Sequence, residues 1–96
     1  MKQDQIIQLL SRQRSALDRL GIESLSLFGS VVRGENQPES DMDILVEFKS
    51  KATFDRYMEL KFFLEDLLES RVDLVTHKAL RPSMRPVIQR EAIRVA

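Results

Sequence analysis

The segment from Asp41 to Phe48 constrains the fold more strongly than any other part of the sequence. Along an extended strand, successive side chains point to opposite faces of a sheet. One face receives Asp41, Asp43, Leu45 and Glu47, and the other receives Met42, Ile44, Val46 and Phe48. The second face is wholly apolar and needs a covering layer. The first face begins with two carboxylates, which call for a chemical explanation.

The rest of the chain supplies the covering layer and further strands. Apolar residues recur with helical spacing in three segments, and Gly21 and Thr53 are placed to stop the first helix and to cap the second. This order predicts an α/β (α+β) fold, a small mixed β-sheet covered by helices on one face. The expected elements are helices over about residues 2–20, 54–70 and 83–94, strands over 22–28, 41–48 and 71–76, one turn of helix near 30–34, and a loop at 35–40.

Composition limits the class of protein. The chain has 96 residues, which predicts a single domain over residues 1–96. Its 15 basic and 15 acidic residues cancel, so net charge gives no argument for binding nucleic acid or an anionic membrane. The absence of cysteine excludes a disulfide scaffold and thiolate zinc sites. No apolar run approaches the ~20 residues of a membrane span, and the N-terminus has no signal-peptide core, so a cytoplasmic location is expected.

Asp41 and Asp43 lie on the same face of the predicted strand, with α-carbons ~6.6 Å apart. Two unpaired carboxylates at that distance repel one another, and a divalent cation between them removes the conflict. Oxygen ligands without available sulfur favour magnesium or manganese over zinc. The alternative is structural, with one carboxylate capping a turn while the other is solvated.

Gly29 and Ser30 form a sharp turn directly after a predicted strand. Glycine allows close approach of the backbone or a positive φ. Backbone N–H groups and the Ser30 hydroxyl at the start of a following helix suit phosphate oxygens. An ordinary strand-to-helix turn is the alternative for these two residues taken alone.

Asp73 is the candidate for a third carboxylate. It lies in a short hydrophobic strand, between Val72 and Leu74. If that strand neighbours residues 41–48, Asp73 lies ~4.8 Å across from the strand that carries Asp41 and Asp43. The alternative is a salt bridge to Arg71 or to another arginine.

Together these segments resemble the DNA polymerase β-like nucleotidyltransferase superfamily, and within it the minimal nucleotidyltransferase (MNT) proteins. The resemblance covers nearly the whole chain and implies the polymerase β-like nucleotidyltransferase fold. The residues that carry it are Phe28-Gly29-Ser30, Arg33-Gly34, Ser40-Asp41-Met42-Asp43-Ile44 and Asp73.

The resemblance also implies a mechanism. ATP is the substrate, and two magnesium ions, with manganese as an alternative ion, stabilise the attacking and leaving oxygens. Asp73 serves as a ligand and as a general base. For Arg33, an ordinary surface arginine is an equal alternative. The residues implied are Asp41, Asp43 and Asp73 for catalysis and metal binding, and Gly29, Ser30, Arg33 and Ser40 for nucleotide binding.

The resemblance further implies a partner. The usual partner of MNT proteins is a HEPN-domain RNase toxin, and the two form a hetero-oligomer. The expected activity is transfer of AMP to a protein hydroxyl, a tyrosine of that toxin, in the manner of a type VII antitoxin. In a chain this small the acceptor site has to come from another molecule. The alternative is a catalytically silent antitoxin or nucleotide sensor that acts by binding alone.

Three other features have simpler interpretations. His77 is expected in an exposed loop rather than at a metal, and Tyr57 is expected to pack within a helix rather than to accept a nucleotide. The basic C-terminal segment could contact an acidic partner or RNA, but a solvated face is the simpler interpretation because Glu91 interrupts it. Its arginines are Arg81, Arg85, Arg90 and Arg94.

Overall fold

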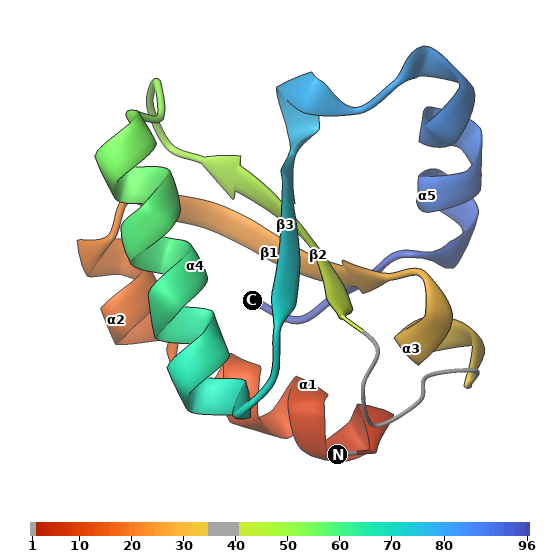
Figure 1. Cartoon of the computed structure of the whole chain (residues 1–96), viewed down its shortest axis with the longest axis horizontal. Helices are drawn as coiled ribbons and strands as arrows, with labels where there is room; N and C mark the ends of the chain where they lie inside the picture. Colours follow the sequence, from red (N-terminus) through yellow and green to blue (C-terminus); the bar gives the residue numbers. More distant parts are fainter. Residues whose placement is uncertain (1, 35–40) are drawn as a thin grey trace.

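The computed structural model describes residues 2–34 and 41–96, and Figure 1 traces their path. Helices and strands alternate along most of the chain, as the sequence predicted. Two short 3-10 turns, η1 (His77–Ala79) and η2 (Pro82–Met84), lie between the last long strand and the last helix. The remaining elements are α1 (Gln3–Ser11), α2 (Arg14–Arg19), β1 (Ile22–Phe28), α3 (Ser30–Arg33), β2 (Met42–Phe48), α4 (Phe54–Leu68), β3 (Val72–Thr76), α5 (Arg85–Glu91) and β4 (Ile93–Arg94).

The strands form one mixed sheet in the order β3-β2-β1-β4. β2 runs antiparallel to β1 and parallel to β3, and β4 runs antiparallel to β1. This arrangement confirms the predicted mixed sheet. It also brings the end of β1 and the beginnings of β2 and β3 to the same edge of the sheet, which we call the carboxylate edge because Asp41, Asp43 and Asp73 lie there.

The main core lies between one face of the sheet and helices α1, α2 and α4. It contains the alternate apolar residues that the sequence placed on one face of β2, together with helix residues such as Ile6, Leu17 and Leu64, which are fully buried. The opposite face carries a smaller cluster of Phe28, Leu80 and Ile88, through which α5 packs on the sheet. In Figure 1, α4 and α5 accordingly lie on opposite sides of β3. Helical cover is therefore thicker on the predicted face but is also present on the other.

The helix predicted over residues 2–20 is wrong in one respect, because it is broken into α1 and α2. At the break, the Ser11 hydroxyl lies 2.7 Å from the carbonyl oxygen of Ile7 and 2.9 Å from that of Val95. The Arg14 guanidinium donates to the carbonyl of Ile22 at 2.6 Å. Ser11 thus bonds back to its own helix and across to Val95, while Arg14 bonds to Ile22 beyond α2, and such side-chain competition for backbone groups interrupts helices.

The helix predicted over residues 83–94 is also too long. Helix α5 ends at Glu91, and the next residues form β4, where Ile93 pairs with Leu27 and Arg94 with Ser26. Without β4, the outer backbone groups of β1 would have no strand partner. The β-branched Ile93 suits that extended pairing. In the described part of the chain, no helix is both long and apolar enough to cross a membrane.

Candidate active site at the carboxylate edge

Asp43 and Asp73 lie directly beside one another at the carboxylate edge. They are Cα partners in the parallel pairing of β2 with β3, and side chains at such positions point to the same face. Each strand begins only one residue earlier, so both carboxylates lie at the end of the sheet rather than in its middle. The predicted placement of Asp73 on the strand beside Asp43 is therefore confirmed.

Asp41 lies just before β2 and is exposed. Its Oδ1 atom is 3.6 Å from Nε of Arg71, the residue just before β3. The expected alternative partner of Asp73, Arg71, thus pairs with Asp41 instead. Both side chains of this pair are at least half exposed, at 80% and 50%, and such pairs hold their geometry weakly. A stronger ligand can therefore draw Asp41 away from Arg71.

Gly29 packs against the Asp43 carboxylate from the end of β1. Its φ of 74° lies in the region that favours glycine. A Cβ atom added to Gly29 would overlap Oδ2 of Asp43 and lie only 2.9 Å from its Cγ. The turn therefore needs glycine for two reasons, its backbone angle and the closeness of Asp43. Ser30 follows as the first residue of α3, so the turn and the carboxylates form one site.

The environment of Asp43 disfavours its charged form. The pKa of this half-buried carboxyl is raised from 3.8 to about 6, and burial is the largest cause. The neighbouring Asp73, by its charge and a hydrogen bond, and then the Asp41 charge contribute the rest of this rise. Only the Arg33 guanidinium acts in the opposite direction and lowers it. A site that concentrates negative charge in this way gains from a bound cation.

The donor atoms fit a hard divalent cation. Three carboxylates come to one edge of the sheet, and the chain has no cysteine that would favour a softer ion. Among residues 2–34 and 41–96, however, no group of three His, Asp or Glu side chains is already close enough to hold an ion. Of the three carboxylates, Asp41 is the one that is paired with Arg71.

Arg33 connects this edge to the C-terminal helix. It is the last residue of α3, and its Nη1 atom donates to Oε2 of Glu91 at 3.1 Å. The sequence treated Glu91 only as an interruption of a basic segment and missed this contact. The one feature of the sequence that could have indicated this contact is that Glu91 is an isolated acidic residue among arginines. Ser40, the remaining residue expected to bind nucleotide, lies outside the described residues.

The remaining candidates take no part in the carboxylate edge. His77 is exposed at the start of η1, as expected. The Tyr57 hydroxyl donates to the carbonyl of Leu74 at 2.6 Å, which agrees with the packing interpretation. The arginines of the C-terminal segment, Arg81, Arg85, Arg90 and Arg94, are all exposed.

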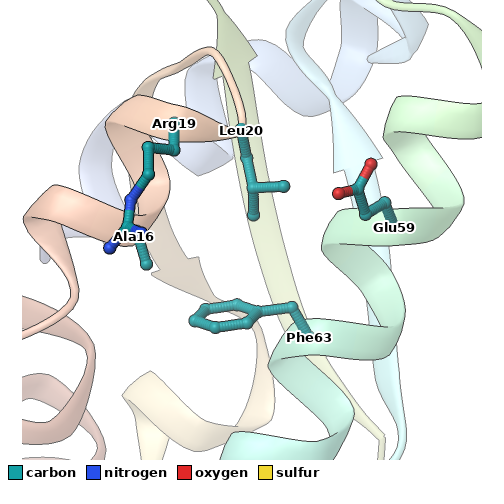
Figure 2. Close-up of a pocket in the computed structure, with 5 residues that line it drawn as sticks. All are labelled: Ala16, Arg19, Leu20, Glu59 and Phe63. Carbon is teal, nitrogen blue, oxygen red and sulfur yellow. The ribbon is translucent and has the colours of Figure 1, made fainter.

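A shallow hollow of about 270 Å³ lies elsewhere, between α2 and α4. These helices cover the face of the sheet opposite the carboxylates. Figure 2 shows Leu20 and Phe63 reaching toward the space between the helices, with Arg19 and Glu59 on its two sides. Among the described residues that line this hollow, Glu59 is the one carboxylate.

Comparisons with known proteins show the family of the chain. Residues 10–95 match the nucleotidyltransferase domain family. Protein adenylyltransferase MntA of Thermococcus cleftensis is 37% identical over 87 residues, which are 91% of this chain and 88% of that protein. A solved structure of a candidate minimal nucleotidyltransferase is 38% identical, with a TM-score of 0.83, and the match covers 97% of this chain and 95% of the other.

A more distant structural match shares the fold. It is a solved complex of a tri-AMPylated HEPN toxin of Shewanella oneidensis with an MNT antitoxin. The matched chain is 22% identical, with a TM-score of 0.66, and the match covers 94% of this chain and 71% of the other.

Proposed function

Because this chain belongs to the nucleotidyltransferase domain family and is a nucleotidyltransferase, we propose that it transfers AMP from ATP to a hydroxyl group of a protein. The proposed acceptor is a tyrosine of a HEPN-domain RNase toxin, which makes this chain an antitoxin of the type VII kind. The observation that carries the proposal is the side-by-side placement of Asp43 and Asp73 against the Gly29 turn. The relative named protein adenylyltransferase supports AMP as the transferred group.

The proposed metal site uses the three carboxylates of the edge. Asp41 and Asp43 hold one magnesium ion, and Asp73 joins Asp43 in holding a second. When bound, magnesium offsets the charge of the triphosphate and lowers the pKa of the incoming hydroxyl. Asp41 exchanges its weak pairing with Arg71 for this role. With a pKa of about 6, Asp43 is mostly ionised and ready to bind a cation near neutral pH, and it has to give up a proton on binding mainly at pH 6 and below.

The remaining roles divide between the acceptor and the nucleotide. Asp73 is exposed, so it can reach the acceptor hydroxyl and accept its proton as the oxygen attacks the α-phosphorus of ATP. Pyrophosphate leaves, and AMP stays on the acceptor oxygen. The glycine backbone at Gly29 lets a phosphate approach closely, Ser30 donates its hydroxyl, and Arg33 donates from the end of α3. We also assign Ser40 to this nucleotide site.

The HEPN partner is proposed from the relatives. The structural neighbour from Shewanella oneidensis pairs an MNT antitoxin with a toxin that carries AMP groups. Its identity to this chain shows only a shared fold. The proposal that this chain has a similar partner therefore also uses the more similar relative, which is named a protein adenylyltransferase.

Intact-mass spectrometry tests the proposal. The protein is incubated with ATP, magnesium and the product of the neighbouring gene, and both chains are weighed. We expect the partner to gain one AMP mass or a multiple of it. Asp73→Asn should slow this gain by at least about 100-fold, because the proton acceptor is lost. Asp18→Asn, which removes an exposed ion pair on α2, should leave the rate unchanged.

The same experiment separates transfer from binding alone. If neither chain gains mass while a stable complex still forms and silences the partner, the protein is a binding-only antitoxin. If the partner gains mass equally with Asp73→Asn and with the wild type, the assignment of Asp73 as proton acceptor is wrong.

A further inference from the structure

The Arg33–Glu91 ion pair joins the two parts of the chain that flank the carboxylate edge. Arg33 lies at the end of α3, four residues after Gly29, and Glu91 lies at the end of α5. The distance between Nη1 and Oε2 is 3.1 Å, and the side chains are 43% and 30% exposed. A pair this exposed adds little to stability. The main effect of this ion pair is therefore on the position of the Arg33 side chain.

Glu91 is held firmly by its neighbours on both sides. Three residues before it, Ile88 is buried against Phe28 in the smaller core cluster. Two residues after it, Ile93 pairs with Leu27 in the sheet. The backbone of Glu91 is thus fixed to β1, the strand that ends in the Gly29 turn. A carboxylate mounted in this way is a rigid anchor for a long side chain.

Arg33, in contrast, stands on a helix of only four residues that is followed by the left-handed Gly34. An arginine side chain has many rotamers, and fixing one of them costs conformational entropy. Helix α3 packs against both β1 and β2, the two strands whose ends bring Gly29 and Asp43 to the carboxylate edge, so Arg33 stands beside that edge. A guanidinium has five N–H donors, so donation to Glu91 is compatible with donation to a phosphate.

We propose that Glu91 is a positioning residue of the nucleotide site, whose carboxylate holds the Arg33 guanidinium in place to contact a phosphate oxygen of ATP. This inference rests on the proposed function, since it takes ATP as the ligand. Holding the side chain beforehand removes part of the entropy cost of binding. The pairing also offsets the negative charge of Glu91, which would otherwise repel the phosphates.

Binding of a non-hydrolysable ATP analogue with magnesium, measured by calorimetry, tests the inference. Glu91→Gln keeps the size of the side chain but removes its charge, and we expect it to weaken binding by about 3- to 10-fold. Arg33→Ala should weaken binding at least as much. In the Arg33→Ala background, Glu91→Gln should have no further weakening effect, because its role passes through Arg33.

Three outcomes would overturn the inference. Glu91→Gln could bind with wild-type affinity, or it could weaken binding equally with and without Arg33, which indicates a merely structural role. Alternatively, the wild type could bind no nucleotide, and then the proposed function fails as well. Asp18→Asn is the matched control, since it removes ion pairs of 2.8 Å with Arg14 and 3.2 Å with Lys49. Lys49 follows the far end of β2, so this control should bind normally.

Discussion

Asp43 links the candidate site to folding through its ionisation. Its pKa is raised from 3.8 to about 6, so between these values the folded chain binds more protons at this residue than the unfolded chain does. Stability must then fall as pH rises through this window, and the penalty is complete above pH 6. This direction is opposite to that of a carboxylate in a salt bridge. It identifies Asp43 as a group whose ionised form is less stable in the folded chain than in the unfolded one.

The first prediction follows from this sign. In metal-free buffer, Asp43→Asn should be more stable than the wild type at pH 7.5 and about equal at pH 4. The gain should be on the order of 1 kcal/mol, after discounting for solvent exposure. Urea unfolding across this range measures it, and the difference between the two proteins cancels the titration of other residues. A constant difference at all pH values would contradict the raised pKa.

Single residues also show how far the sequence could predict the site. The Gly29 turn and the carboxylates could be predicted from the sequence, because residue type and the alternation of side chains along a strand are local properties of the chain. The pairing of Arg33 with Glu91 could not, since it joins positions far apart in the chain, across a distance that only the tertiary fold sets. The sequence offered Asp73 as the ion-pair partner of Arg71, whereas the structure pairs Arg71 with Asp41. Sequence reasoning could not separate these two pairings, because both are compatible with the same strand order.

At the level of elements, alternation and capping predicted the interior of the fold well. Thr53 caps α4 as expected, and its hydroxyl accepts the N–H of Arg56 at 3.1 Å. The errors lie at the ends, where α1 breaks from α2 and where β4 replaces the end of a helix. Residues 93–94 are apolar or amphipathic enough for either state, and the open edge of β1 decides between them. Whether these residues form helix or strand therefore depends on pairing with β1, which is distant in sequence and is not visible in the local spacing of apolar residues.

The second prediction concerns α5, which only a small cluster holds on the sheet. Ile88→Ala should destabilise the protein by about 2 kcal/mol, at the low end for such changes because the cluster has few members. Leu64→Ala, in the main core, should cost more, about 3–5 kcal/mol. Hydrogen exchange should accelerate in α5 for Ile88→Ala before the rest of the sheet is affected. Equal acceleration everywhere would show that α5 unfolds only with the whole molecule.

For the whole molecule, the sheet serves as the frame that gathers residues from three strand ends. The helices α1, α2 and α4 pack on one face of the sheet and α5 packs on the other, while the carboxylates lie at the ends of the strands. Negative charge at that edge costs stability in the free protein, as Asp43 shows. A cation bound there, as proposed, would offset this cost and so couple folding to loading of the site.

The third prediction tests this coupling in the intact protein. Magnesium with a non-hydrolysable ATP analogue, at about ten times its dissociation constant, should add about 1.4 kcal/mol of stability, since it binds only the folded state. That corresponds to a rise in Tm of roughly 5–10 °C for a domain of this size. The rise should be larger at pH 7.5 than at pH 5, because Asp43 must lose its proton before it can hold the ion. Asp43→Asn should show little rise at either pH, whereas Asp18→Asn should behave as the wild type does. A full rise with Asp43→Asn would place the cation somewhere other than the carboxylate edge.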